Sequence, residues 1–171
     1  IYWQGTTAGG ESTVTASSSQ VVSASGTYYF RAQSAVGCWG NEGSAIVTIN
    51  TVPDAVTVTG GGTQCGGTMD LNASGGTGGT IYWQGTTSGG TSTTTASSSQ
   101  TVSASGTYYF RSRSAEGCWG PEGSATVTIN PLPGDVTVSG AGVQCGGSRT
   151  LTATGGTGGT IYWQNTTNNG I

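Results

Sequence analysis

Apolar residues in this chain alternate with polar ones in short runs. The clearest run covers residues 125–130 (ATVTIN), and a shorter one covers residues 56–58 (VTV). A two-residue period is typical of strands with one face toward a core, and no window shows the 3.6-residue period of a helix. Glycine-rich segments such as residues 75–79 separate the runs and supply turns that need positive φ. The pattern therefore predicts an all-β protein.

The whole pattern returns after 80 residues. The segment IYWQGTT at residues 1–7 recurs unchanged at residues 81–87 and with one change at residues 161–167, and 59 of the first 80 positions match the next 80. This period is too long for helical solenoid repeats and suits whole small β domains in a line. A catalytic site is normally built once, so a unit copied this closely indicates a building block.

Prolines mark the joints between copies, because proline interrupts a strand ladder and stiffens a linker. Pro53 and the segment Pro131-Leu132-Pro133 frame one complete domain at residues 53–130. Residues 1–52 are then the C-terminal part of a preceding copy, and residues 131–171 the N-terminal part of a following one. Since the chain opens and closes inside a repeat, we expect it to be part of a longer protein. The complete copy is predicted to have seven short strands, at about 56–59, 68–73, 81–84, 92–95, 100–103, 107–114 and 124–130.

Alternation within these strands predicts which side chains face the core. Trp83 is expected between two sheets, against Tyr108 or Leu71. The segment Gly106-Thr107-Tyr108-Tyr109 opens the next-to-last strand, and a tyrosine there is a candidate tyrosine corner. A domain of ~80 residues with so thin a core is marginal, so cross-links or contacts between units should help. The predicted inward residues are Trp3, Leu71, Ala73, Ile81, Trp83, Val102, Tyr108, Phe110, Ala125, Val127 and Ile129. The predicted outward residues are Tyr82, Gln84, Tyr109, Arg111 and Arg113.

Composition removes several classes of function. Charged residues make up 6% of the chain, the net charge is −3, and there is no histidine or lysine. Without histidine no Ser-His-Asp or Cys-His site exists within the chain, and the carboxylates are scattered, so we predict no enzyme activity. The four arginines form no run, which predicts no nucleic-acid partner. No apolar run reaches the ~20 residues of a membrane-spanning helix, and no acidic cluster suits calcium, so we expect no transmembrane segment, metal or cofactor.

Four cysteines alternate between two sequence contexts, GCWG and QCGG, with two in each repeat. They are Cys38, Cys65, Cys118 and Cys145. No Cys-x-x-Cys pair or histidine accompanies them, which argues against zinc. Paired, regularly spaced cysteines in a small β unit indicate disulfides and an oxidising location, and free buried thiols are the alternative.

Four motifs together resemble a known family. The segments QCGG, IYWQGTT, VSASGTYY and GCW are similar to the immunoglobulin-like repeats of Bacteroidota surface proteins. That family often accompanies the C-terminal sorting domain of the type 9 secretion system, and it occurs in very large adhesins, including SprB-type adhesins of gliding bacteria. The resemblance implies tandem immunoglobulin-like β-sandwiches in an elongated array, exported through the outer membrane and displayed on the cell surface as a filament. The sorting domain itself is not in this sequence, so the secretion route follows from the repeat type alone.

Aromatic residues supply the candidate binding positions. Tyr82, Tyr109 and Arg111 are predicted on one outer face, where they can stack on a sugar or contact another chain. The alternative is a cross-strand pair that only stabilises the sheet. Tyr2, Tyr29 and Arg31 repeat the set in the first copy, so a site there would be multivalent. Trp39 and Trp119 follow the hairpin cysteines, and we expect them to pack on the neighbouring domain at the joint rather than to bind a ligand.

The sequence leaves two disulfide patterns open. Cys65 lies between the first two predicted strands and Cys118 lies in the last hairpin, so a sandwich places them at opposite ends, ~20 Å or more apart. Disulfide Cα atoms lie within ~7 Å. In a head-to-tail array, the first of these cysteines faces the hairpin cysteine of the next domain. We therefore prefer bonds across the joints to the Cys65–Cys118 bond, and both remain alternatives.

Taken together, the sequence predicts the structural shaft of a large extracellular adhesin or cell-surface filament, a mechanical spacer in adhesion and gliding motility. Its expected partners are neighbouring repeats, other copies in a filament, and surface polysaccharide. The rival interpretation is a multivalent carbohydrate-binding array that uses the outer-face aromatic residues.

Overall fold

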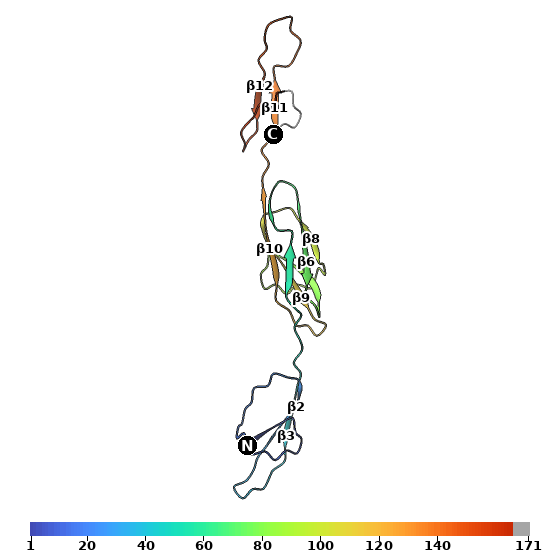
Figure 1. The fold of residues 1–171 in the computed structure, drawn as a ribbon, viewed down its shortest axis with the longest axis vertical. Coiled ribbons are helices and arrows are strands. Elements are labelled where there is room, and N and C mark those ends of the chain that lie inside the picture. Colours follow the sequence, from blue (N-terminus) through green and yellow to red (C-terminus); the bar gives the residue numbers. More distant parts are fainter. Residues whose placement is uncertain (166–171) are drawn as a thin grey trace.

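The computed structural model describes residues 1–165, and this part of the chain contains strands and turns but no helix. The strands form four sheets, ordered β1-β2-β3, β4-β6-β8, β5-β10-β9-β7 and β11-β12. Figure 1 shows three segments one after another in a line, with every pairing inside one segment. The all-β prediction is confirmed. The strands are β1 Tyr2–Gly5, β2 Gly26–Arg31, β3 Gly43–Val47, β4 Val56–Thr59, β5 Gly62–Cys65, β6 Met69–Gly75, β7 Thr80–Gly85, β8 Ser99–Val102, β9 Gly106–Arg113, β10 Gly123–Asn130, β11 Val136–Ser139 and β12 Thr152–Gly155.

The middle domain, residues 53–130, packs its two sheets face to face. One sheet contains β4, β6 and β8, and the other contains β5, β10, β9 and β7. Most neighbouring strands are antiparallel, but β5 runs parallel to β10, with Gly62 opposite Val127 and Cys65 opposite Asn130. Side chains alternate between the core and solvent along β6, β9 and β10, as the sequence pattern requires; β10, for example, buries Val127 and exposes the residues on either side.

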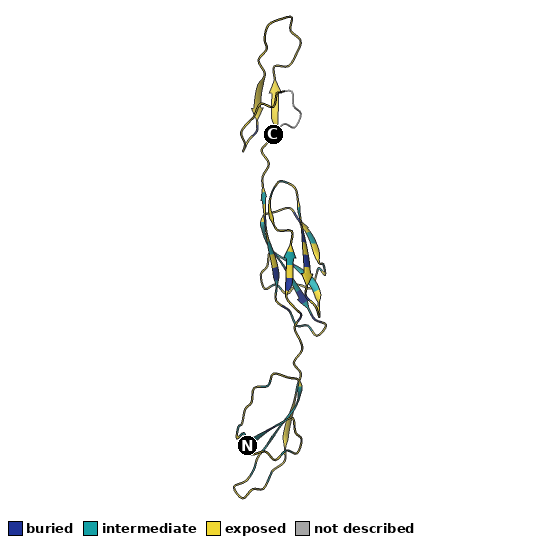
Figure 2. Ribbon diagram, in the orientation of Figure 1, coloured by how far each residue is buried: buried dark blue, intermediate teal, exposed yellow. Residues whose placement is uncertain are grey.

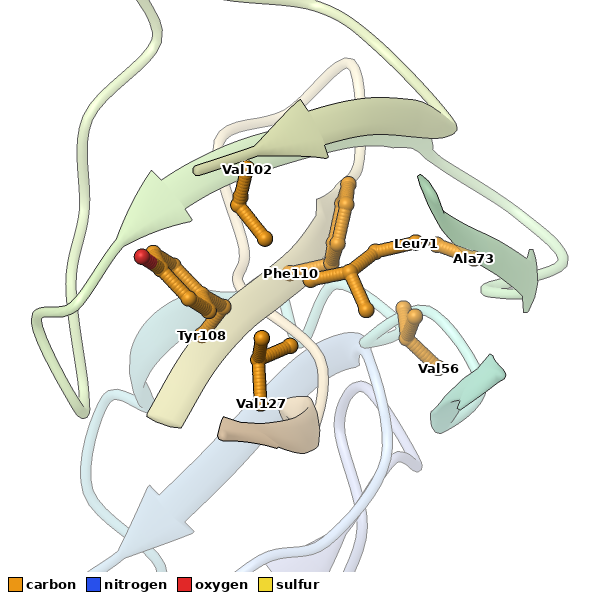
Figure 3. Close-up of a cluster of buried hydrophobic side chains, with 7 residues drawn as sticks. All are labelled: Val56, Leu71, Ala73, Val102, Tyr108, Phe110 and Val127. Atoms are coloured by element: carbon orange, nitrogen blue, oxygen red, sulfur yellow. The ribbon is translucent and has the colours of Figure 1, made fainter. Parts of the chain in front are cut away.

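All buried hydrophobic side chains within residues 1–165 belong to this middle domain (Figure 2). Leu71 and Phe110 are fully buried at 0% exposure and lie against each other at the centre of the cluster (Figure 3). Val56, Ala73 and Val102 extend this cluster from the first sheet, and Tyr108 and Val127 extend it from the second (Figure 3). The core is therefore a single layer of side chains between the sheets.

Trp83 lies at the edge of this core rather than at its centre. Its ring stacks on Tyr108, with centroids 5.4 Å apart, and meets Phe110 edge-on at 4.8 Å, but the side chain stays partly exposed. The Tyr108 hydroxyl donates a 2.8 Å hydrogen bond to the carbonyl of Ala104, four residues upstream. This is the bond of a tyrosine corner, so that prediction is confirmed.

The sequence predicted one strand that does not form and missed one strand that does. No strand forms at residues 92–95, where only Ala96 makes an isolated bridge to Tyr82. The strand β5 was missed, because its sequence GTQC has no apolar alternation and lies between the glycine pairs Gly60-Gly61 and Gly66-Gly67. It forms because the outer edge of β10 offers free backbone groups that β5 satisfies.

The two outer segments contain repeat-equivalent residues but lack part of the sandwich that surrounds them in the middle domain. Leu151 occupies the position of Leu71 but is 46% exposed, and Val136 occupies that of Val56 but is 48% exposed. Residues 19–22 and 142–145, which correspond to β8 and β5, form no strand. Local sequence therefore does not suffice for these strands, which need the opposite strand beside them.

Replacing Phe110 with alanine tests this core. Phe110→Ala should destabilise the middle domain by about 3–5 kcal/mol, because it empties the centre of the inter-sheet layer. The measurement is amide hydrogen exchange of β9 and β10 by mass spectrometry.

The matched control is Phe30→Ala. Phe30 occupies the same repeat position in the first segment, where it is only partly buried and faces no second sheet. This variant should leave exchange in β9 and β10 unchanged. Equal loss of protection in the two variants would contradict the assignment of the core.

Candidate functional site

Four side chains meet on the outer face of β7 and β9. Tyr82 projects from β7, Arg111 and Arg113 project from β9, and Trp119 follows the hairpin after β9. Tyr82 and Trp119 pack edge to face with ring centroids 5.7 Å apart. The guanidinium groups of Arg111 and Arg113 lie over the Trp119 ring, 5.4 and 5.8 Å from its centroid. Such cation–π contacts hold the indole flat against the sheet. We call these four residues the outer-face cluster.

Arg111 also ties two loops to the sheet. Its Nε donates to the carbonyl of Gly120 at 3.0 Å, and its Nη1 donates to the carbonyls of Gly89 and Gly90 at 3.3 and 3.2 Å. A planar guanidinium can reach several fixed acceptors at once, whereas the ammonium of lysine cannot match this geometry. The Arg111 guanidinium, predicted as part of a binding face, is therefore bonded to backbone carbonyls.

Glu122 also holds the loop that contains Ser88, Gly89 and Gly90. Its carboxylate accepts hydrogen bonds from the amide of Gly89 and the hydroxyl of Ser88, both at 2.7 Å. The Gly89 amide, followed by the Ser88 hydroxyl, lowers the pKa of Glu122; desolvation opposes them and the charge of Arg111 adds to them. This perturbed carboxylate has hydrogen-bonding partners within the fold, which is a structural use of its charge.

Gln84 was predicted to face solvent, and the structure places it inside the loop with only 6% exposure. Its Oε1 accepts from the amide of Ser92 at 2.9 Å, and its Nε2 donates to the carbonyl of Ser92 at 3.0 Å. The side chain thus takes both backbone groups of a residue that was expected to pair in a strand at residues 92–95. The recurrence of glutamine in all three IYWQ motifs was the signal for this role.

The first segment contains the same arrangement, except that Gln33 stands where the middle domain has Arg113. Tyr2 and Trp39 lie 5.7 Å apart, and the Arg31 guanidinium lies 5.3 Å from the Trp39 centroid. Arg31 donates to the carbonyls of Gly9, Gly10 and Gly40, as Arg111 does to their counterparts. Because this segment has no second sheet in residues 1–52, β1, β2 and β3 with their loops suffice to build the cluster.

Tyr82 and Tyr109, the aromatic pair that the sequence suggested, are not directly opposite each other in the sheet. Tyr82 lies opposite Arg111, whereas Tyr109 lies opposite Gly85 beyond an irregularity in the β7–β9 register. Tyr29 is likewise opposite Gly5 in the first segment, away from Tyr2. The aromatic neighbour of Tyr82 is instead Trp119 of the hairpin, and that of Tyr2 is Trp39.

That tryptophan also departs from its predicted place at the joint. Trp119 forms a bridge with Arg113 and Trp39 forms one with Gln33, and each bridge turns the indole back over its own sheet. Both rings therefore contact a tyrosine of their own segment, Tyr82 or Tyr2. The GCWG motif drew attention to the tryptophan, but it does not show which way the hairpin turns and therefore what the indole contacts.

The four cysteines are free thiols in residues 1–165, with Cys38, Cys65 and Cys145 exposed and Cys118 half-buried. Cys65 ends β5 opposite Asn130, the last residue of β10, while Cys118 lies in the hairpin before β10 begins at Gly123. Seven residue steps along β10 span about 23 Å. A bond between Cys65 and Cys118 is therefore incompatible with this fold, because disulfide Cα atoms lie within ~7 Å.

Two hollows of the described surface are not built like a catalytic site. One lies over β6 and β8 and is lined by Asp70, Asn72, Ser99, Gln100 and Thr101. The other is the open apolar face of the third segment, which includes Leu151 and Trp163. No three His, Cys, Asp or Glu side chains within residues 1–165 are grouped to hold a metal. This same range has no helix with the length and hydropathy of a membrane span.

Comparison with known proteins identifies the middle domain. A family model described as an Ig-like domain, CHU_C associated, matches residues 53–131. No curated protein matches the chain. The match, together with the all-β fold, confirms the predicted immunoglobulin-like fold. The family indicates an extracellular protein with repeats of structural or adhesin type, and its domains are typically not enzymes.

Neutralising Glu122 tests the loop contact. Since the folded pKa lies below the ordinary value of 4.5, the carboxylate stabilises the fold above that pH, and the effect is lost as the pH falls through the folded pKa. Glu122→Gln should therefore lower stability at pH 7 by about 0.5 kcal/mol or less, as expected for a solvent-screened contact. The deficit should shrink between pH 7 and pH 3, as measured by urea unfolding followed by fluorescence.

Glu116→Gln is the control, because Glu116 is exposed at the hairpin tip. It should match the unchanged chain at both pH values. A Glu122→Gln deficit that grows as the pH falls would contradict this account.

Proposed function

We propose that the chain forms part of the shaft of an extracellular adhesin or surface filament. The match of residues 53–131 to the model of an Ig-like domain, CHU_C associated, supports this proposal. The shaft acts as a spacer that holds a distal binding region away from the cell. Export by the type 9 route, attachment to the cell surface and a part in gliding motility belong to this same proposal.

The placement of the two ends of the domain carries the proposal. The amide of Val56, at the start of β4, donates to the carbonyl of Pro121, so the chain enters the domain beside the start of β10. It leaves at the opposite end, where β10 finishes at Asn130 (Figure 1). We call these the N-terminal pole and the C-terminal pole. A domain with ends at opposite poles adds its full length to a chain, which is the geometry a spacer needs.

The outer-face cluster supports a structural role over a binding role. Arg111 is engaged with three backbone carbonyls, and Trp119 is covered by two guanidinium groups. A sugar that stacked on the indole would have to displace contacts that hold the hairpin. The repetition of this cluster in the first segment fits a building block that is copied for its architecture.

Small-angle scattering tests the spacer. The extended chain consists of residues 1–171 followed by a second copy of residues 92–171, which continues the repeat in phase and adds 80 residues. Its maximum dimension should exceed that of the original chain by about 40 Å, from seven residue steps along β10 and six along an extended linker. The cross-section should stay constant. A compact particle with little increase in length would overturn the proposal.

A polysaccharide array tests the rival role. We expect no saturable binding by the extended chain, because the outer-face cluster already uses its donors and ring faces internally. The informative variant is Tyr82→Ala, with Tyr109→Phe as control. Saturable binding that Tyr82→Ala abolishes and Tyr109→Phe preserves would establish a carbohydrate-binding array instead.

A further inference from the structure

We infer that a disulfide bond crosses each joint of the proposed array. It links Cys65 of one domain to the cysteine that takes the place of Cys118 in the next domain. This inference rests on the proposed end-to-end arrangement and adds to it a covalent lock between neighbours. The inference follows from the positions of Cys65 and Cys118, which lie at opposite poles of the middle domain.

Cys65 lies at the C-terminal pole, beside the linker. It ends β5, and the next residue, Gly66, donates its amide to the carbonyl of Asn130 at 2.9 Å. Gly66 packs so closely on the linker that a β-carbon there would lie 2.9 Å from Cδ1 of Leu132. The Cys65 thiol is exposed. The end of β5 is therefore fastened to the segment that leads into the next domain.

Cys118 lies at the N-terminal pole, beside the preceding linker. Its amide donates to the hydroxyl of Ser114 at 3.2 Å, within the hairpin. Two residues later Gly120 packs against the incoming chain, where a β-carbon would lie 2.6 Å from the carbonyl oxygen of Pro53. The hairpin that carries Cys118 is thus fixed against the proline at which the domain begins.

The third segment begins in the same way as the middle domain. A β-carbon at Gly159 would lie 2.8 Å from Cγ of Pro133, and one at Gly79 would lie 2.7 Å from Cγ of Pro53. The amide of Gly134 donates to Thr157 at 2.9 Å, as that of the equivalent Asp54 donates to Thr77 at 3.0 Å. Pro133 therefore takes the place of Pro53, and the hairpin of a complete third domain would pack against Pro133.

These contacts bring the two cysteines to one joint. The Cys65 side of the joint touches Leu132, and the hairpin of the next domain would touch Pro133, the following residue. Consecutive Cα atoms are only 3.8 Å apart. Rotation about this short linker is enough to bring the two thiols together, whereas the distance of about 23 Å within one domain is fixed by β10.

Bond formation needs an oxidant. The two thiols lose two protons and two electrons as the sulfur–sulfur bond forms, and the electrons reduce the disulfide of an external thiol–disulfide donor to two thiols. The product fixes the rotation between the domains and holds each joint by a second covalent connection. Calcium is not needed for this kind of stiffening.

The test uses the extended chain oxidised with glutathione disulfide and digested without reduction. Mass spectrometry should find the Cys65 peptide joined to the hairpin peptide, with two fewer free thiols per chain than after reduction. The two hairpin copies have one sequence, so serine variants distinguish them. Cys118→Ser should preserve the bond, and serine at the added copy of Cys118 should abolish it.

The opposite pattern, in which only Cys118→Ser abolishes the bond, would overturn the inference in favour of a bridge within one domain. Thiols that all stay free would overturn it as well. Scattering from the same samples separates the two proposals. If the chain has no disulfide but still gains its full length, the disulfide inference is wrong and the spacer proposal stands. If the chain is compact, the end-to-end arrangement on which both proposals depend is wrong.

Discussion

The packing of Leu71 against Phe110 joins the two sheets of the middle domain, and its other features depend on that contact. Around it the chain buries only a thin layer of side chains, yet that layer separates an ordered sandwich from the half-built outer segments. The comparison is internal, because the same residue type at the same repeat position is buried as Leu71 and half-exposed as Leu151. Burial of these residues thus reflects the presence of the opposite sheet.

This dependence explains what the sequence could and could not predict. Alternation located most strands of the middle domain and the residues that face its core, since a two-residue period is a local property. It missed β5, because the residues of that strand have no pattern of their own and pair only when the edge of β10 is present. It placed Gln84 outside, because strand alternation does not show that a side chain can take over the backbone groups of Ser92.

The outer-face cluster, unlike the core, does not depend on the second sheet. Arg31 and Arg111 make the same set of bonds although only the second belongs to a domain with two sheets. Three strands and their loops are therefore a self-sufficient unit on which the second sheet is laid. The sequence placed Tyr82 and both arginines of this cluster on the outer face but assigned the tryptophans to the joint, because the direction of a hairpin tip depends on its bridge to the neighbouring strand.

The parallel pairing of β5 with β10 has a consequence for a protein under tension. The two strands belong to opposite ends of the domain's sequence, so pulling on its termini draws them past each other along their length. Their hydrogen bonds would then resist together in shear rather than open one at a time from an end. Under such a pull these bonds would be strained as a group, and β5, a strand with no apolar pattern, would carry the load together with β10.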